Sequence, residues 1–306
     1  MATVAQATVA GPSIRPLGSA LGAEVTGVDL SRRVDDDTFA RIHRAFLEHH
    51  FLVFRDQALT VEQQIAFSER FGPLEAFPEK DKQKDAATVY NVANVTADGK
   101  KLGSKDIQVI FLKVNARWHT DSSYRSVPSL ASLLYCIEPL PDEAVGGETE
   151  YANMFAAHDA LPEDLRRQLE PLHMVHYYEY GRRLYPELPP MTHHERVHVP
   201  PVCHPVIRVH PDRGGKRSLF FTENAGGEIG GMPLAQGQAL HRQLVEHVTD
   251  PRFSYKHRWR KGDLGVWDNR CLLHRLREYD EDRYRRVLRR TTVAGAGPVV
   301  GPFSRQ

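Results

Sequence analysis

The sequence predicts a mainly β protein with flanking α-helices, in which the strands form a sandwich or a barrel. Eight short runs after residue 129 have the composition of strands, and Pro or Gly separates many of them. These runs are LASLLYCI, TEYANM, HMVHYY, CHPVIRVH, KRSLFFT, FSYKHRWR, DLGVWD and RRVLRRTTV. Two helices interrupt them, and each begins after a proline, Pro162 or Pro233, at a plausible first helical position. We expect these helices to pack outside the β core.

The sequence pattern of residues 23–72 predicts alternating strands and helices. Residues 23–30 (AEVTGVDL) and 51–56 (FLVFRD) have strand composition. Asp35 precedes a helix whose apolar residues fall on one stripe, and Thr60 with Gln63 forms a capping box at the start of another. Residues 95–107 (VTADGKKLGSKDI) are polar and aperiodic, which indicates a loop beside the core.

The length of the chain favours one domain. A chain of 306 residues with 41% hydrophobic residues can bury a substantial core, and β domains of this size often stay single. We therefore expect a flexible N-terminal tail over residues 1–13 and a single domain over residues 14–306.

Charge and cysteine content exclude several classes of protein. Forty Lys and Arg against thirty-nine Asp and Glu leave a net charge of +1, which argues against a nucleic-acid or anionic-membrane binder. The three cysteines stand far apart without a CxxC pair, as in a reducing cytoplasm, and no apolar run is long enough to span a bilayer. We expect a cytoplasmic protein with a small-molecule partner, and the sequence leaves a homo-oligomer open.

Three residues form a candidate metal site. His119 and Asp121 in WHTD are two apart, so an extended backbone places both side chains on one face. His274 follows a compact apolar strand and turn, VWDNRCLLHR. Two imidazoles and one carboxylate on one side of an octahedral ion leave open positions, which is the arrangement typical of non-haem Fe(II) oxygenases. A second His-x-Asp, at residues 210–212, is followed by Arg-Gly-Gly and predicts a hairpin turn instead.

Paired arginines near the C-terminus strengthen the metal hypothesis. A strand over RRVLRRTTV places Arg286 and Arg290 on one face and Arg285 and Arg289 on the other. We interpret Arg285 and Arg289 as solvated residues of a basic edge strand. Guanidinium groups hold carboxylates bidentately, so the other pair predicts two anions near the metal: a dicarboxylate cosubstrate and an acidic substrate.

With these residues together, the chain resembles the taurine dioxygenase and 2,4-dichlorophenoxyacetate dioxygenase (TauD/TfdA) family of 2-oxoglutarate-dependent oxygenases. The resemblance runs from residue 21 to residue 293 and includes, in family order, VEQQIAFSERFGPLE, WHTDSSY, GGETEY, AAHDALPEDLRRQLE, WDNRCLLHR and RRVLRRTTV. It implies a double-stranded β-helix (jelly roll) and hydroxylation of a small carboxylate with release of succinate and CO₂. An aryloxyalkanoate or an acidic metabolite would fit as the substrate.

The resemblance also implies roles for single residues. His119, Asp121 and His274 would bind Fe(II), while Thr149 and Arg286 would hold the distal carboxylate of 2-oxoglutarate; O₂ would be the other cosubstrate. The implied substrate-binding residues are Arg290, Asn115, Lys80 and Phe77. Taurine-type enzymes carry His and Tyr at the last two places, so the detail is closer to the phenoxyacetate branch.

Two other functions compete with this interpretation. Residues 194–198 (HERVH) spell the HExxH zinc-peptidase motif, but they lie between Pro189-Pro190 and Pro200-Pro201, so we expect a polar loop rather than the helix that the motif needs. A non-catalytic jelly-roll binding module is the second alternative, with the segment of Tyr177, Tyr178, Tyr180 and Arg182-Arg183 as a contact surface.

Overall fold

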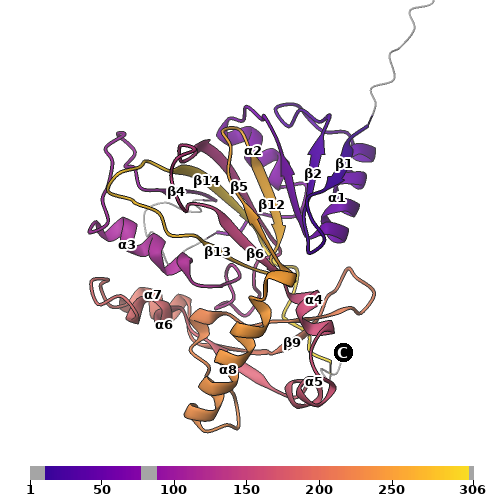
Figure 1. Ribbon diagram of the computed structural model, residues 1–306, viewed down its shortest axis with the longest axis vertical. Coiled ribbons are helices and arrows are strands. Elements are labelled where there is room, and N and C mark those ends of the chain that lie inside the picture. The colour runs from indigo at the N-terminus through magenta and orange to yellow at the C-terminus, as the bar shows by residue number, and fades with distance from the viewer. Residues whose placement is uncertain (1–10, 77–87, 303–306) are drawn as a thin grey trace, which may run out of the picture.

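A large antiparallel-dominated sheet forms one wall of the molecule (Figure 1). The computed structural model describes residues 11–76 and 88–302. The sheet has seven strands in the order β1-β2-β3-β12-β5-β14-β4. Their bounds are β1 Ser13–Pro16, β2 Ala23–Thr26, β3 Phe51–Phe54, β4 Val89–Ala93, β5 Ala131–Glu138, β12 Leu264–Asp268 and β14 Val287–Val293.

Smaller sheets face this wall and complete the predicted double-stranded β-helix. A three-stranded sheet has the order β11-β6-β13, and two further pairs are β7 with β8 and β9 with β10. Their bounds are β6 Thr149–Asn153, β7 His173–His176, β8 Val202–Pro205, β9 Ile207–Val209, β10 Arg217–Leu219, β11 Ser254–His257 and β13 Leu272–Leu276. The predicted strand CHPVIRVH is therefore divided between β8 and β9.

Strand β12 shows how the layers are held together. Leu264 and Val266 pack in the core beneath α1 and α2, whereas Trp267 packs in the core between the large sheet and β6 and β13. Alternate residues of a strand point to opposite faces, so a strand that is buried on both faces must be continuously apolar. This explains why LGVWD carries no polar residue before Asp268.

Two helices cover the outer face of the large sheet, as Figure 1 shows. Helix α1 (Asp36–His49) begins at the predicted cap, Asp35, whose side chain accepts from the backbone N–H of Thr38. Helix α2 (Val61–Ser68) begins with the predicted Thr60–Gln63 capping box. Burial of Phe46 and Ile42 on the inner stripe of α1 contributes about 1.5 to 3 kcal/mol per side chain.

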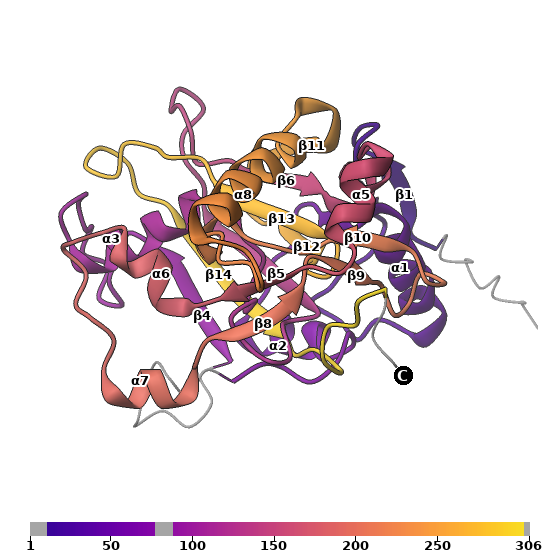
Figure 2. The same ribbon diagram turned by 90° about the horizontal axis from the view of Figure 1, so that it is seen from below.

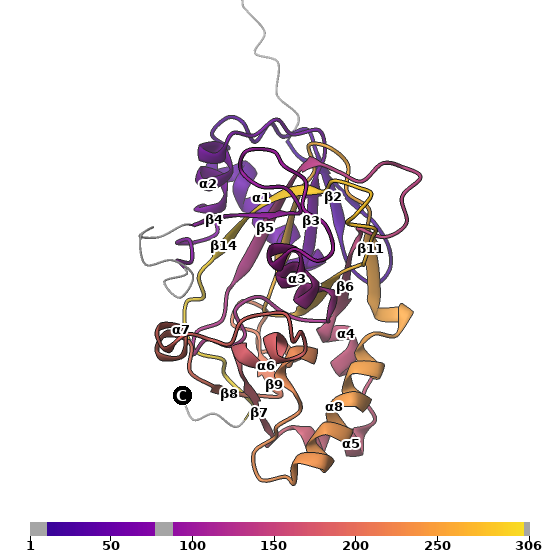
Figure 3. The same ribbon diagram turned by 90° about the vertical axis from the view of Figure 1, so that its left-hand side faces the viewer.

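The remaining helices flank the smaller sheets and one open end of the β-helix. Helices α5 (Glu163–Leu169) and α8 (Leu234–Val248) form where they were predicted, but Pro162 and Pro233 are their N-cap residues rather than their first helical residues. Figures 2 and 3 show α3 and α6 close together at the open end, with α7 further out. The other bounds are α3 Ile107–Lys113, α4 Met154–Asp159, α6 Tyr178–Arg183, α7 His193–His198, and the 3₁₀ helices η1 Val114–Ala116, η2 Glu223–Ala225 and η3 Pro251–Phe253.

The interpretation of Arg289 as a solvated residue on an edge strand is wrong. Strand β14 lies between β5 and β4, so it is an inner strand. Arg289 is buried, its Nε donates to Gln64 Oε1 at 2.8 Å, and its Nη2 donates to the Leu59 and Thr60 carbonyls. The guanidinium is satisfied by the start of α2, an interaction that strand periodicity alone does not reveal.

Strand β1 overlaps the end of the predicted N-terminal tail. Strand β1 begins at Ser13, the last residue of the predicted tail, and residues 1–10 lie outside the described structure. In residues 11–76 and 88–302, no helix is long and apolar enough to cross a membrane.

Candidate metal centre

His119 and His274 are brought together by the backbone. The His119 N–H donates to the His274 carbonyl at 2.9 Å, and the His274 N–H donates to the His119 carbonyl at 2.7 Å. This reciprocal pair is the hydrogen-bonded type of antiparallel bridge, which places both side chains beside each other. The two imidazole centroids are 4.2 Å apart. The fold thus joins residues that are far apart in the chain.

Asp121 completes the group from the loop that follows His119. The hydroxyl of the intervening Thr120 donates to the Asn269 carbonyl at 2.7 Å, and Ser122 takes a positive φ of 54° that turns the chain away. The ligand atoms of His119, Asp121 and His274 all lie within 4.8 Å of one another. All three residues are buried.

The electrostatics keep the three side chains in their metal-binding protonation states. Burial lowers the pKa of His119 and lowers that of His274 well below the usual range, so both imidazoles are neutral near pH 7. Burial acts to raise the pKa of Asp121, but Arg290 and the neighbouring imidazoles outweigh it and hold this pKa below its usual range.

Neighbouring groups orient the ligands. The Nδ1–H of His119 donates to the Arg117 carbonyl at 2.8 Å, which leaves Nε2 for a metal. Asp121 accepts from Ser132 Oγ at 2.6 Å and from Arg290 Nη1 at 2.7 Å. Two nitrogens and one carboxylate, all deprotonated, fit a mononuclear Fe(II) site with open positions.

A second buried group, His210, Asp268 and Cys271, also has ligand atoms close together, but Asp268 is already neutralised. Arg270 Nε donates to Asp268 Oδ1 at 2.8 Å and Arg270 Nη2 donates to Oδ2 at 2.8 Å, while His210 Nε2 lies 3.1 Å from Oδ2. A cation would have to displace this ion pair. Residues 210–212 lead into the turn between β9 and β10, as predicted, and His210 does not join the metal centre.

A small recess beside the two histidines, which we call the basic recess, holds Thr149 and Arg286. Arg286 is 3% exposed and its Nε donates to the Gly147 carbonyl at 3.1 Å; it forms no salt bridge within residues 11–76 and 88–302. Thr149 Oγ1 accepts from Trp259 Nε1 at 2.9 Å, so its own hydrogen is free to donate. A buried guanidinium without a carboxylate is costly, which points to an anionic ligand.

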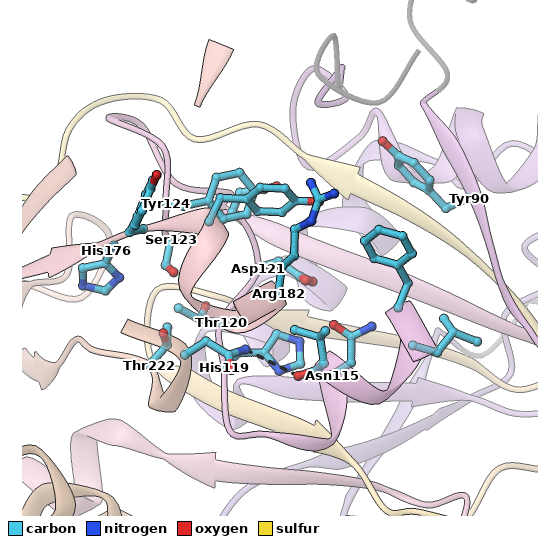
Figure 4. A pocket seen from close by; sticks show the side chains of 18 of the residues that line it. Tyr90, Asn115, His119, Thr120, Asp121, Ser123, Tyr124, His176, Arg182 and Thr222 are labelled. Atoms are coloured by element: carbon cyan, nitrogen blue, oxygen red, sulfur yellow. Dashed lines mark hydrogen bonds between the residues drawn. The ribbon is translucent and has the colours of Figure 1, made fainter. Parts of the chain in front are cut away.

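A larger cavity of about 430 Å³, which we call the substrate cavity, is lined by His119 and Asp121 and adjoins the basic recess (Figure 4). Asn115 and Arg290 line both spaces. The aromatic residues of the cavity wall are Tyr90, Phe111, Tyr124, Tyr177 and Tyr178. His119 and Asp121 reach the cavity, so a bound molecule can lie against the metal centre.

The structure brings together seven of the nine predicted site residues around the metal centre. His119, His274, Thr149, Arg286, Arg290 and Asn115 all line the basic recess, and Asp121 lines the substrate cavity. Phe77 and Lys80 lie outside the described residues. The sequence reasoning did not identify His176, Thr222 or Asn224 as cavity residues, because no spacing marks them.

The expectation of a loop at HERVH is wrong, but the zinc interpretation gains nothing from the correction. A capping box between Thr192 and Glu195 starts the six-residue helix α7. Its Glu195 is held by that cap and by Arg182 Nη1 at 2.7 Å, so it is not poised as a general base. The described residues place no third ligand beside His194 and His198.

A double-stranded β-helix with a buried His-x-Asp…His centre and an adjacent basic recess defines the class of 2-oxoglutarate-dependent mononuclear iron oxygenases. The model of the family described as "Taurine catabolism dioxygenase TauD, TfdA family" matches residues 13–292. The chain belongs to this family, and it is an alpha-ketoglutarate-dependent dioxygenase. This sets aside the zinc hydrolase and the non-catalytic module.

The similar proteins include dioxygenases named for 2,4-dichlorophenoxyacetate and (S)-phenoxypropionate. The chain is 38% identical to an alpha-ketoglutarate-dependent 2,4-dichlorophenoxyacetate dioxygenase of Cupriavidus pinatubonensis, over 92% of this chain and 97% of that protein. It is 36% identical to an (S)-phenoxypropionate/alpha-ketoglutarate-dioxygenase of Sphingobium herbicidovorans, over 92% of this chain and 94% of that protein. The crystal structure of AAD-2 in complex with Mn(II) and N-oxalylglycine superposes with a TM-score of 0.84 at 35% identity, covering 94% of this chain and 100% of that one.

Proposed function

We propose that this dioxygenase hydroxylates a small aromatic carboxylic acid of the aryloxyalkanoate type. The observation that carries the proposal is the substrate cavity, in which the guanidinium of Arg290 lies beside Asp121 of the metal centre and aromatic side chains form the walls. Iron bound by the triad supplies the O₂-dependent oxidation. The relatives that act on 2,4-dichlorophenoxyacetate and phenoxypropionate support the same substrate class.

Arg286 and Thr149 bind the distal carboxylate of 2-oxoglutarate in this proposal. The basic recess is small, buried and lined by both histidines, so a dicarboxylate held there has its other end at the metal. A guanidinium beside a hydroxyl offers several donors to one carboxylate. Asn115, which lines both spaces, lies where cosubstrate and substrate meet.

Arg290 binds the carboxylate of the substrate. One of its nitrogens donates to Asp121, and its Nε is buried without a partner in the described part of the chain. The guanidinium therefore keeps a donor for an anion while it orients the metal ligand. Phe77 and Lys80 remain predicted pocket residues.

The reaction on an aryloxyacetate gives products that identify it. The acid, 2-oxoglutarate and O₂ yield the hydroxylated ether carbon, succinate and CO₂; the hemiacetal then breaks its carbon–oxygen bond to give a phenol and glyoxylate. The test is a screen for succinate and glyoxylate with aryloxyacetates, alkyl carboxylates, sulfonates and sulfate esters. Equimolar release from aryloxyacetates supports the proposal, and succinate release only with the other classes contradicts it.

A further inference from the structure

His176, at the end of β7, is a buried polar side chain that lines the substrate cavity without a protein partner. It is 1% exposed, and neither ring nitrogen has a hydrogen-bond partner among the described residues. Buried polar groups nearly always have a partner. An unpartnered imidazole at a ligand cavity therefore points to a partner that arrives with the ligand.

Two aromatic neighbours hold the ring of His176, and no hydrogen bond from the described residues uses either of its nitrogens. Its ring stacks on Phe220 at 5.4 Å and meets His204 edge to face at 5.1 Å. His204 is not its hydrogen-bond partner, because both nitrogens of His176 lack a partner among the described residues and His204 Nε2 is hydrogen-bonded to the Arg125 carbonyl at 2.9 Å. Burial lowers the pKa of His176 well below the usual range, so the neutral ring offers one donor and one acceptor.

Asn224 adds a second unmatched group to the same wall. It lies on η2, which packs against both β7 and α6, and it lines the substrate cavity. Its Nδ2 lies 3.4 Å from the Val114 carbonyl, whereas its Oδ1 is buried without a partner in residues 11–76 and 88–302. This oxygen is an acceptor, so it favours a hydroxyl or an N–H on the bound molecule.

The cation on this wall is already neutralised. Arg182 Nη1 pairs with Glu195 at 2.7 Å, and Arg182 Nη2 donates to the Pro189 carbonyl at 2.7 Å, which leaves the buried Nε as its one donor without a partner among the described residues. The wall that carries His176 therefore matches a neutral polar group better than a second anion.

The Arg290 end and the His176 end of the substrate cavity lie apart from each other. Arg290 lies over the Tyr90 ring at 5.7 Å, and Figure 4 shows Tyr90 and His176 on opposite sides of the cavity with His119 and Asp121 between them. An aromatic acid bound through its carboxylate to Arg290 thus directs the far edge of its ring toward His176.

We propose that His176, assisted by Asn224, determines specificity by binding a hydroxyl or N–H group on the aromatic ring, at the end opposite the carboxylate. The inference rests on the proposed function and narrows its substrate class to ring-hydroxylated or N–H-bearing aryloxyalkanoates. A ring that carries only chlorine or methyl groups would leave the His176 imidazole and the Asn224 Oδ1 without a hydrogen-bond partner.

The experiment compares matched acids. Glyoxylate release is measured with 3- and 4-hydroxyphenoxyacetate and with 3- and 4-methylphenoxyacetate, for the wild type, His176→Phe and Asn224→Ala. Phenylalanine keeps the stack on Phe220 and removes both nitrogens. The control is His173→Phe, an exposed position on the same strand. The 2-oxoglutarate charge-transfer band and thermal unfolding report whether each variant is folded.

We expect the wild type to prefer at least one hydroxy acid over its methyl counterpart by about tenfold or more in kcat/KM. In His176→Phe, the ratio of kcat/KM for the hydroxy acid to kcat/KM for the methyl acid should fall to about 1. In Asn224→Ala this ratio should also fall, whereas in His173→Phe it should equal that of the wild type. A wild-type ratio near 1 for both pairs, or a ratio unchanged in the folded His176 and Asn224 variants, overturns this inference and leaves the proposed function standing. Absence of glyoxylate from all four acids overturns the proposed function, and this inference with it.

Discussion

Arg286 and Arg290 lie four residues apart at the same metal centre, yet they have different neighbours. Arg286 Nε donates to the Gly147 carbonyl in the basic recess, whereas Arg290 donates to Asp121 and lines the substrate cavity. We expect Arg286→Ala to raise the KM for 2-oxoglutarate by at least about tenfold, because a charged hydrogen bond contributes about 1.5 to 3 kcal/mol. Succinate kinetics at varied 2-oxoglutarate measure this.

Arg290→Ala should instead raise the KM for the aromatic acid, and it should also weaken metal binding because Asp121 loses a donor. Arg290→Lys, which keeps the charge, separates the two effects. Equal changes in both KM values in the two alanine variants would contradict this division of roles.

Asp268 makes a pH-dependent contribution to stability from a site outside the metal centre. Burial acts to raise its pKa, but Arg270 and His210 outweigh burial and hold the pKa well below its usual range. A carboxylate with a depressed folded pKa stabilises the protein above its unfolded pKa near 3.9, and this stability is lost as the pH falls below that value.

Between pH 7 and pH 3 we therefore expect the wild type to lose about 1 kcal/mol more free energy of unfolding than Asp268→Asn. Urea unfolding at both pH values measures the difference. Asp164→Asn, at an exposed position of α5, serves as the control and should match the wild type. An equal loss in Asp268→Asn and the wild type would count against a buried, ionised Asp268.

At the scale of elements, the turn before β6 positions the basic recess. Gly146 and Gly147 have φ values of +89° and +77°, and a Cβ on Gly146 would lie 1.8 Å from the Glu278 carbonyl oxygen. Gly146→Ala must displace this turn, and with it the Gly147 carbonyl that holds Arg286. We expect a loss of about 1 to 3 kcal/mol in the free energy of unfolding and a higher KM for 2-oxoglutarate.

Gly214→Ala is the matched control for that variant. Gly214 has a φ of +58° with no heavy atom within 4 Å of an added Cβ, so the substitution adds backbone strain without a clash. Its stability cost should be smaller and its KM for 2-oxoglutarate unchanged. A 2-oxoglutarate KM unchanged in Gly146→Ala would show that the turn does not position Arg286.

The elements that sequence reasoning predicted well are those whose signal is local. The caps at Asp35 and Thr60 and the prolines before α5 and α8 are read within a few residues. Arg289 was misinterpreted because its hydrogen-bond partners lie at the start of α2, far from it in the sequence. The helix at HERVH was missed because the prolines on both sides argued against a helix, although Thr192 and Glu195 form a capping box.

At the scale of the whole molecule, the metal triad was predictable and the substrate cavity was not. The triad belongs to motifs that the family resemblance aligns, so residues 119, 121 and 274 could be found in the chain. The cavity wall is assembled from β4, α3, the loop after His119, the β7–α6 segment and η2. These stretches come together only in the folded protein, so no local sequence pattern identifies His176 or Asn224 as a cavity residue.

A bound metal ion should couple these separate parts of the molecule. His274 lies on β13, while His119 and Asp121 lie in a loop joined to it through a single bridge. A ligand that binds only the folded state at 100 times its Kd adds about 2.7 kcal/mol of stability. We expect Mn(II) with N-oxalylglycine, the pair bound in the AAD-2 crystal structure, to raise the melting temperature by roughly 5 °C.

Differential scanning calorimetry of metal-free protein, with and without the two ligands and then with excess EDTA, measures this shift. Asp121→Ala should lose most of the shift because one of the three ligands is gone, and Arg286→Ala should lose the part that N-oxalylglycine adds while it keeps the part due to Mn(II). His210→Asn changes the His-x-Asp sequence outside the metal centre and serves as the control. Its melting temperature without ligands can be lower, because His210 lies 3.1 Å from Asp268. The ligands should still raise that temperature by the full amount, because His210 lines neither the basic recess nor the substrate cavity. A full shift in Asp121→Ala would mean that the ion binds elsewhere in the chain.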